Sequence, residues 1–252
     1  MSTSANVRLT GLHTRYQFTE TIRVPIAVIG TTLFPSLSLL FFVVPQSFAQ
    51  DPREATAAAA QLAVFAVMSV CLFTYGVGVA EDRALPWDGY IRTLPVGPLP
   101  RLTGRLLTGL AFVVIGLLPL VLIAWLLTAA TLPPSRLALS AAALLAAGVP
   151  LFAIGISIGY SLSTKAAMAL AQSLLLPLAF GGGLFLPPNM FPGWFEAIST
   201  WLPTRAGRDL VVTATTGAAL PGTTVLVLAG WTLLTGSLAV WAYRRDEGRR
   251  FR

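Results

Sequence analysis

The stretch Gly155-Ile156-Ser157-Ile158-Gly159 fits the G-x-S-x-G pattern that surrounds the nucleophilic serine of many hydrolases. In those enzymes the serine follows a strand, and a histidine activates it. Here the pattern lies inside an apolar stretch, and the only histidine, His13, belongs to a polar segment near the start of the chain. The same residues also fit G-x-x-x-G, whose small side chains let two membrane helices approach closely. We therefore expect helix packing at this motif and no enzymatic role.

Two other residue types that often carry chemistry are nearly absent. Cys71 is the only cysteine, and the sequence has no C-x-x-C or cysteine–histidine cluster that could hold zinc. Lys165 is the only lysine, and no G-x-x-x-x-G-K-[ST] loop is present to bind phosphate groups. We therefore expect no metal site or cofactor in this chain, and any ATP that drives it would be hydrolysed by another chain.

The remaining sequence indicates which elements position these residues. Hydrophobic residues make up 55% of the 252 residues and charged residues only 11%, against about 25% charged residues in soluble domains. Six long stretches contain no Asp, Glu, Lys or Arg, and each exceeds the roughly 20 apolar residues of a membrane-spanning helix. Such continuous apolar runs do not resemble barrel strands. We predict an all-α membrane protein with one transmembrane domain, residues 24–243, whose six helices span about residues 24–47, 57–80, 104–130, 137–162, 166–186 and 221–243.

The basic residues predict how these helices are oriented. The formal net charge is +7, and the arginines cluster at the ends of apolar stretches, which favours a membrane surface over nucleic acid as the partner. With the N-terminus inside, 13 of the 17 Lys and Arg residues fall on the cytoplasmic side and 4 outside, as the positive-inside rule requires. We predict a multi-pass protein of the cell (cytoplasmic) membrane with both termini in the cytoplasm, ending in a basic tail at residues 244–252.

Residues 1–23 are predicted to form a helix at the cytoplasmic interface of the membrane. Leu9, Leu12 and Tyr16 recur at helical spacing among polar residues that include Arg8 and Arg15, which suits a helix that lies in the membrane surface. The interfacial residues that we select are Arg8, Leu12, Arg15 and Tyr16. A disordered leader is the alternative. A cleaved secretory signal is disfavoured because the apolar run that follows is too long and five more spans come after it.

The segment between the fifth and sixth spans is predicted to be a re-entrant hairpin on the outer side. Pro177, Gly181-Gly182-Gly183 and Pro187-Pro188 are expected to interrupt the helix. An aromatic, amphipathic segment follows, containing Trp194 and Trp201. Such a segment favours the membrane interface over free water, so we expect it to dip back into the outer leaflet.

Polar uncharged residues inside the spans are candidates for a translocation path. The set that we select is Thr32, Ser36, Tyr75, Gln172 and the aromatic Phe180. The alternative is that these side chains hold helices together, as polar groups in membrane helices commonly do. Proton-coupled carriers place ionisable residues inside the membrane, and the charge-free spans weigh against that mechanism, although sodium can bind to carbonyls and hydroxyls alone.

Three segments resemble the ABC-2-type permease family, the membrane half of one type of ATP-driven exporter. Arg23-x-Pro25 followed by Leu33-Phe34-Pro35 is similar to the start of the family's first span. Glu81-Asp82-Arg83, Asp88-Gly89 and Leu94-Pro95-Val96 resemble its cytoplasmic loop, and Gly182-Gly183-Leu184-Phe185 with Pro192 and Pro203 resembles its fifth span and outer hairpin. With the six-span layout, the resemblance covers nearly the whole chain.

The resemblance implies a half-transporter. Two permeases, identical or similar, would pair around a central path and bind separate ATP-binding-cassette ATPases, which would hold the ATP and Mg. In that family the interfacial helix and the loop after the second span contact the ATPase. This assigns coupling to Glu81, Asp82, Arg83, Asp88, Gly89 and Arg92. The alternative is that these residues merely solvate a loop and obey the positive-inside rule.

The predicted function is therefore the permease half of an exporter. It would move a hydrophobic or amphipathic small molecule, drug-like or lipid, outward across the membrane. Membership of the drug-export branch of the family would further imply multidrug efflux and a role in antibiotic resistance. The alternative is a self-sufficient secondary carrier or channel. An intramembrane enzyme is disfavoured because the spans offer no paired carboxylates, histidine or metal site.

Overall fold

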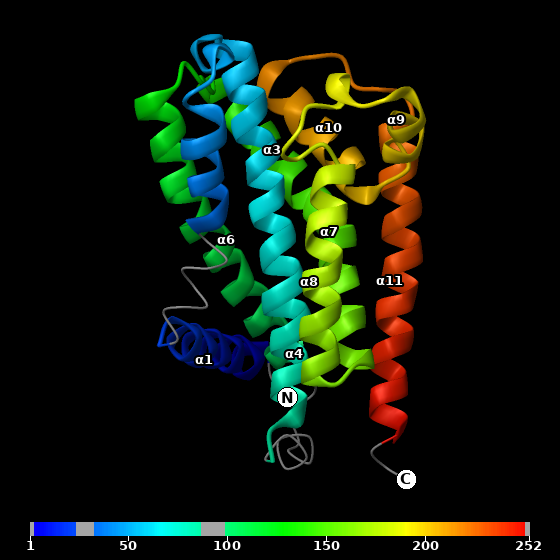
Figure 1. Cartoon of the computed structure of the whole chain (residues 1–252). Coiled ribbons are helices and arrows are strands. Elements are labelled where there is room, and N and C mark those ends of the chain that lie inside the picture. Colours follow the sequence, from blue (N-terminus) through cyan, green and yellow to red (C-terminus); the bar gives the residue numbers. More distant parts are fainter. Residues whose placement is uncertain (1–2, 24–32, 87–98, 250–252) are drawn as a thin grey trace.

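The computed structural model describes residues 3–23, 33–86 and 99–249, and every regular element within these ranges is a helix. Five helices are long and apolar enough to cross a membrane, namely Pro52–Ala84, Thr103–Leu127, Pro134–Ser161, Thr164–Gly181 and Thr224–Glu247. They stand roughly parallel in one bundle (Figure 1). The all-α prediction is confirmed, and within the described residues five helices are candidate membrane spans; the exact bounds of the spans stay a prediction.

The predicted first span, residues 24–47, is only partly described. Residues 24–32 lie outside the described ranges, and the part that follows contains a short apolar helix, Leu33–Val43, whose last turn is the π-helix η1 (Leu39–Val43). This helix is too short by itself to cross a membrane, which needs about 20 residues. The sixth span therefore stays a prediction.

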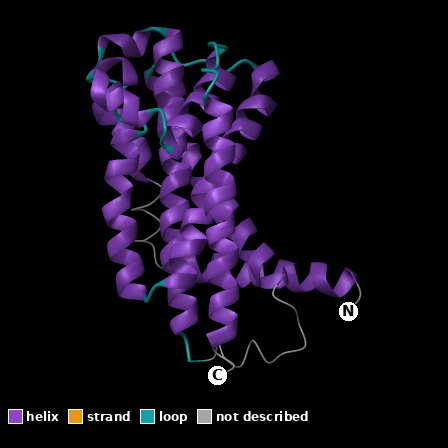
Figure 2. Ribbon diagram, turned by 90° about the vertical axis from the view of Figure 1, so that its right-hand side faces the viewer, coloured by secondary structure: helices purple, strands orange, loops and turns teal. Residues whose placement is uncertain are grey.

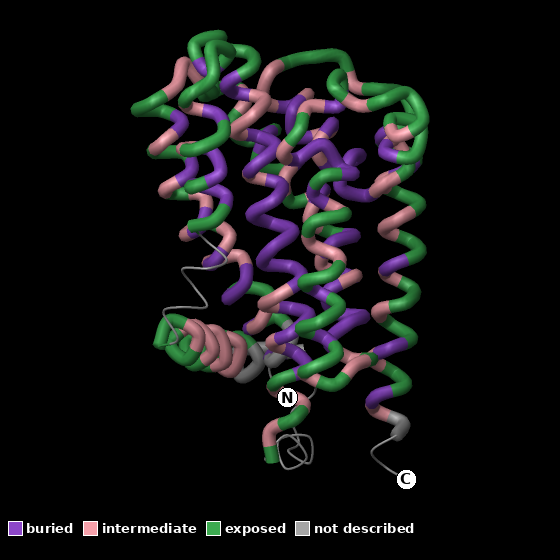
Figure 3. Tube along the Cα trace, in the orientation of Figure 1, coloured by how far each residue is buried: buried purple, intermediate pink, exposed green. Residues whose placement is uncertain are grey.

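The centre of the bundle is a continuous rod made of α3 (Pro52–Val70), the π-helix η3 (Cys71–Val77) and α4 (Gly78–Ala84). In the most apolar stretch of this rod, 78% of the residues are buried inside the protein. In the corresponding stretches of the other four spans, only 17–39% of the residues are buried. Figure 3 shows this buried core along the rod. The outer helices expose large apolar side chains such as Trp125 and Leu226, which suits contact with lipid.

Helix α7 (Pro134–Ser161) packs closely against η3 at the G-x-S-x-G motif. A methyl group added at Gly159 would lie 2.6 Å from the Val79 Cβ and 2.8 Å from the Gly76 carbonyl oxygen. Ser157 is buried and donates its hydroxyl to the Ala153 carbonyl of its own helix at 2.7 Å. These contacts are those of helix packing, as the G-x-x-x-G interpretation predicts.

Helix α1 (Thr3–Ile22) lies across the bundle axis at one end of the molecule (Figure 2). It packs against the start of α6 (Leu99–Leu127). The C-terminal end of α11 (Thr224–Arg249) and the α4 end of the rod lie at this same end (Figure 1). We call it the α1 end. Because α11 continues as helix to Arg249, most of the predicted basic tail is part of that helix.

The opposite end, which we call the α10 end, holds the connection from α8 (Thr164–Gly181) to α11. It contains η4 (Pro188–Met190), α9 (Gly193–Ser199) and α10 (Pro203–Thr216), and the 3-10 helix η2 (Ser47–Gln50) lies beside it (Figure 1). Helix α8 continues through Pro177 and ends at Gly181, so only the glycine part of the predicted interruption is seen. Gly183 has a φ of +71°, a conformation that favours glycine. Re-entry of this connection into the membrane stays a prediction.

Candidate functional site

Arg83, at the end of the central rod, joins three helices at the α1 end. Its Nη2 and Nε donate to Asp246 Oδ1 of α11 at 2.5 and 3.1 Å. Its Nη1 donates to the carbonyls of Gly159 and Leu162, at the end of α7, at 2.7 and 3.2 Å. Asp246 is only 5% exposed, so this pairing offsets part of the cost of burying its charge. We call Arg83, Asp246 and these two carbonyls the Arg83 cluster.

The two acidic neighbours of Arg83 have different surroundings. Asp82 forms a salt bridge with Arg105 of α6, which ties the rod to a further helix. Glu81 is exposed. Of these three predicted coupling residues, Asp82 and Arg83 therefore bind within the chain, and Glu81 is the one presented outward.

The other predicted coupling residues, Asp88, Gly89 and Arg92, lie outside the described residues. The role of all six in coupling stays a prediction.

The N-terminal helix presents two different faces. Thr10, Thr14 and Phe18 face α6, where the hydroxyls of Thr10 and Thr103 lie 3.1 Å apart and the Phe18 ring stacks on Phe112 at 5.3 Å. The predicted interfacial residues occupy the other face and are exposed; they are Arg8, Leu12, Arg15 and Tyr16. This division leaves a mixed basic and apolar face uncovered, as an interfacial helix requires.

The predicted path residues do not form one group. Tyr75 is buried in the bundle, where its hydroxyl donates to the Leu106 carbonyl at 2.9 Å and its ring meets Phe152 edge-on. Ser36 is 1% exposed, and its hydroxyl has no partner among the described residues. Gln172 is exposed on α8, Phe180 is half exposed, and Thr32 lies outside the described ranges. Their role in a path stays a prediction.

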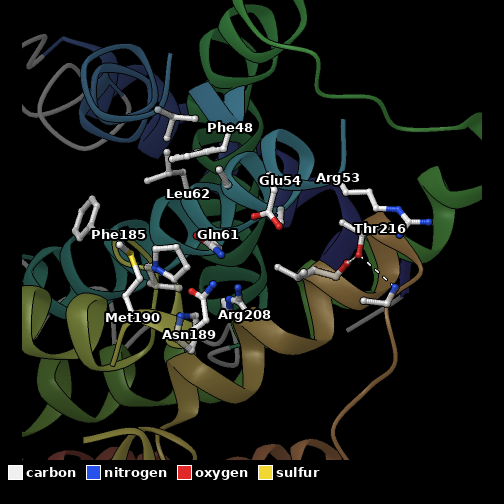
Figure 4. A pocket seen from close by; sticks show the side chains of 18 of the residues that line it. Phe48, Arg53, Glu54, Gln61, Leu62, Phe185, Asn189, Met190, Arg208 and Thr216 are labelled. Carbon is white, nitrogen blue, oxygen red and sulfur yellow. Dashed lines mark hydrogen bonds between the residues drawn. The ribbon is translucent and has the colours of Figure 1, made fainter. Parts of the chain in front are cut away.

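A cavity of about 800 Å³ opens at the α10 end, and we call it the α10 cavity. One part of its wall is apolar and includes Phe42, Phe48, Leu62, Phe185 and Met190. The other part is polar (Figure 4) and includes Arg53, Glu54, Gln61, Asn189, Glu196, Arg205 and Arg208. Its size falls in the range of small-molecule sites, about 300–1,000 Å³.

Asp209 holds the arginines of the cavity in place. Its carboxylate accepts from Arg205 Nε at 2.9 Å and from Arg208 Nη1 at 2.8 Å. Arg205 also donates to the Ser199 hydroxyl at 3.3 Å, and that hydroxyl donates to the Gly181 carbonyl at 2.5 Å. The network thus fastens α9 and α10 to the end of α8.

The Gln61 side chain connects this network to the central rod. It is 5% exposed and lies on the cavity-facing side of α3. In the amide orientation that satisfies its surroundings, its oxygen accepts from Arg208 Nε at 3.2 Å and Nη2 at 2.5 Å. The remaining hydrogen-bonding groups of Arg208 are therefore directed at α3.

Several of these residues were not selected from the sequence. Asp246 lies among the arginines of the predicted tail and resembles a solvated charge, so nothing local marks it as buried. Arg205 and Asp209 are spaced i, i+4, a helical ion-pair pattern that could have been found. The α10 cavity joins segments from the first 62 residues to segments from residue 184 onward, and no local pattern predicts such a meeting.

The five long apolar helices indicate a multi-pass helical membrane protein, with clustered ion pairs at one end and a mixed cavity at the other. A profile of the ABC-2 type transporter family matches residues 8–215, and the chain belongs to this family. It is 23% identical over 186 residues to "Putative transport permease YvfS" of Bacillus subtilis (strain 168), which covers 74% of this chain and 76% of the relative. The chain is therefore the membrane component of an ABC transporter, and its family implies association with an ATP-binding-cassette ATPase.

Proposed function

We propose that the chain is the permease half of an exporter that moves a hydrophobic or amphipathic small molecule outward, energised by a separate ATPase. In this proposal two permeases, identical or similar, form the path. The ATPase binds at the α1 end, which the basic residues predict to be cytoplasmic.

One observation carries the coupling part of this proposal. Both segments that the family resemblance assigns to ATPase contact are attached to α6. Helix α1 is attached through Phe18 on Phe112, and the end of the rod is attached through the Asp82–Arg105 salt bridge. The same end of the rod reaches α7 and α11 through the Arg83 cluster. A displacement at this end would therefore move several helices together, as rigid-body transitions require.

The test is transport by the chain reconstituted in proteoliposomes with its ATPase. We expect export of a fluorescent amphiphile only when both subunits and ATP are present. Glu81→Ala removes the outward-facing carboxylate without touching a described hydrogen bond, and we expect it to lower transport per ATP hydrolysed at least fivefold, since coupling energies of about 1–3 kcal/mol correspond to such factors.

Lys165→Ala serves as the control, because Lys165 is an exposed charge at the same end of the bundle that belongs to none of the predicted sites. It is expected to leave transport unchanged. Full transport by the chain alone, driven by an ion gradient without ATP, would contradict the proposal and favour a secondary carrier.

A further inference from the structure

The charges of the α10 cavity balance, but they are not all paired with one another. Asp209 neutralises one of the two positive charges of Arg205 and Arg208. Arg53, Glu54 and Glu196 also line the cavity, and within the described residues their side chains form no ion pair. The cavity thus presents unpaired groups of both signs to whatever enters it.

The Gln61 amide holds Arg208 at the cavity wall. Its oxygen accepts from Arg208 Nε and Nη2, and Asp209 accepts from Arg208 Nη1. A guanidinium carries five N–H groups, so Arg208 keeps two of them for a ligand. Figure 4 shows Glu54 and Gln61 on the same helix, with Arg208 and Asn189 next to the Gln61 amide.

The apolar part of the wall determines the other half of the ligand. Phe42 and Met190 are 68% and 64% exposed, and together with Phe48 they border the cavity that the polar groups enter. A purely ionic ligand would leave these side chains without contact. An apolar group that covers them would gain about 25 cal/mol for each Å² removed from water.

We infer that the α10 cavity binds a drug-sized amphiphile with a zwitterionic head group. The anionic group of the head lies at Arg208, the cationic group lies at Glu54, and the apolar tail covers Phe42 and Met190. A head group with only negative charge would be repelled by the carboxylates of Glu54 and Glu196. A head group with only positive charge would be repelled by the arginines. This inference rests on the proposed function, because it names the substrate class for the exporter.

The experiment measures binding to the purified full chain in nanodiscs, without ATPase or ATP. Three radiolabelled probes share one dodecyl chain and differ only in the head: dodecylphosphocholine, dodecyl phosphate and dodecyltrimethylammonium. We expect the phosphocholine to bind at least fivefold more tightly than either of the other two probes, because only its head carries charges of both signs. Equal affinities for all three would overturn the inference and show nonspecific uptake by apolar surface.

Two variants locate the binding. Glu54→Gln is expected to weaken phosphocholine binding about fivefold and to leave dodecyl phosphate binding the same or tighter. Gln61→Leu removes the amide that positions Arg208, so it is expected to weaken the binding of dodecylphosphocholine and of dodecyl phosphate together. Glu20→Gln, which neutralises an exposed carboxylate on α1 at the opposite end, is expected to change none of the three affinities.

Preferential binding of dodecyl phosphate, unaffected by Glu54→Gln, would instead indicate an anion site and refute the zwitterion. Because no ATPase is present, these outcomes do not depend on coupling. A chain that binds phosphocholine but transports without ATP would refute the proposed function alone.

Discussion

At the α1 end, Arg83 and Asp246 join helices that are 163 residues apart in the chain, whereas at the α10 end Asp209 pairs with Arg205 and Arg208 of its own helix. The first arrangement joins separate helices directly through an ion pair. The second keeps its ion pairs within α10, and Arg205 and Arg208 extend it by hydrogen bonds to Ser199 and Gln61 beside a cavity. The comparison suggests that the α1 end passes on movement, while the α10 end shapes a binding surface.

The largest effect is expected from breaking the Arg83 cluster. Asp246→Ala would leave the Arg83 guanidinium at the end of the rod without its carboxylate, and removing one partner of a buried pair costs about 3–5 kcal/mol. The free energy of unfolding, measured by SDS titration in mixed micelles, should fall by this amount. Glu20→Ala, on the exposed face of α1, should change it by less than about 0.5 kcal/mol.

A double variant separates the pair from its neighbours. Adding Arg83→Ala to Asp246→Ala removes the guanidinium that has lost the Asp246 carboxylate, so part of the lost stability should return. Recovery should be incomplete because the Gly159 and Leu162 carbonyls lose their donor as well. A double variant less stable than Asp246→Ala alone would argue against the loss of the Arg83–Asp246 ion pair as the cause.

The contrast between the two ends also explains what could be predicted from the sequence. The spans were predictable because a membrane helix must be apolar over its whole length, and that property is local. The Asp82 and Arg83 segment was recognised, but its partners were not. Arg105 and Asp246 lie 23 and 163 residues from the residues that they bind, and the sequence does not show which surface charges turn inward.

At the α10 end the helices between Gly193 and Thr216 were expected only as an aromatic hairpin. Pro203 begins α10, a position that proline favours. Arg205 and Asp209 carry a visible i, i+4 pattern. The cavity itself was not predictable, because it depends on how far α3, η2 and α10 stand apart, and that distance is set by packing along the whole bundle.

A smaller effect is expected at the α10 end for the equivalent substitution. Asp209→Ala leaves two arginines without a carboxylate, but Arg205 keeps the Ser199 hydroxyl and Arg208 keeps the Gln61 oxygen. The lost ion pairs also lie within α10, whereas Asp246→Ala breaks an ion pair between two helices. We expect a loss of about 2–3 kcal/mol, less than for Asp246→Ala in the same SDS titration. A loss as large as that of Asp246→Ala would remove the distinction between the ends.

The smallest effect tests how closely helices pack at the two ends. Gly159→Ala at the α1 end would place its Cβ 2.6 Å from the Val79 Cβ and 2.8 Å from the Gly76 carbonyl oxygen, and overpacking of this kind costs about 1–2 kcal/mol. Gly207→Ala at the α10 end meets only the Ala147 Cβ, at 3.0 Å, within 3.5 Å, so we expect a loss below about 1 kcal/mol.

Gly230→Ala is the matched control for these two variants, because nothing lies within 4 Å of its added methyl group. Alanine exceeds glycine in helix stability by about 0.8–1 kcal/mol, so this variant should be slightly more stable than the natural chain. The order expected in thermal unfolding is Gly230→Ala, then Gly207→Ala, then Gly159→Ala as the least stable. If Gly207→Ala were the least stable, the tighter helix contact would lie at the α10 end, and the α1 end could not act as the more rigid unit that passes on movement.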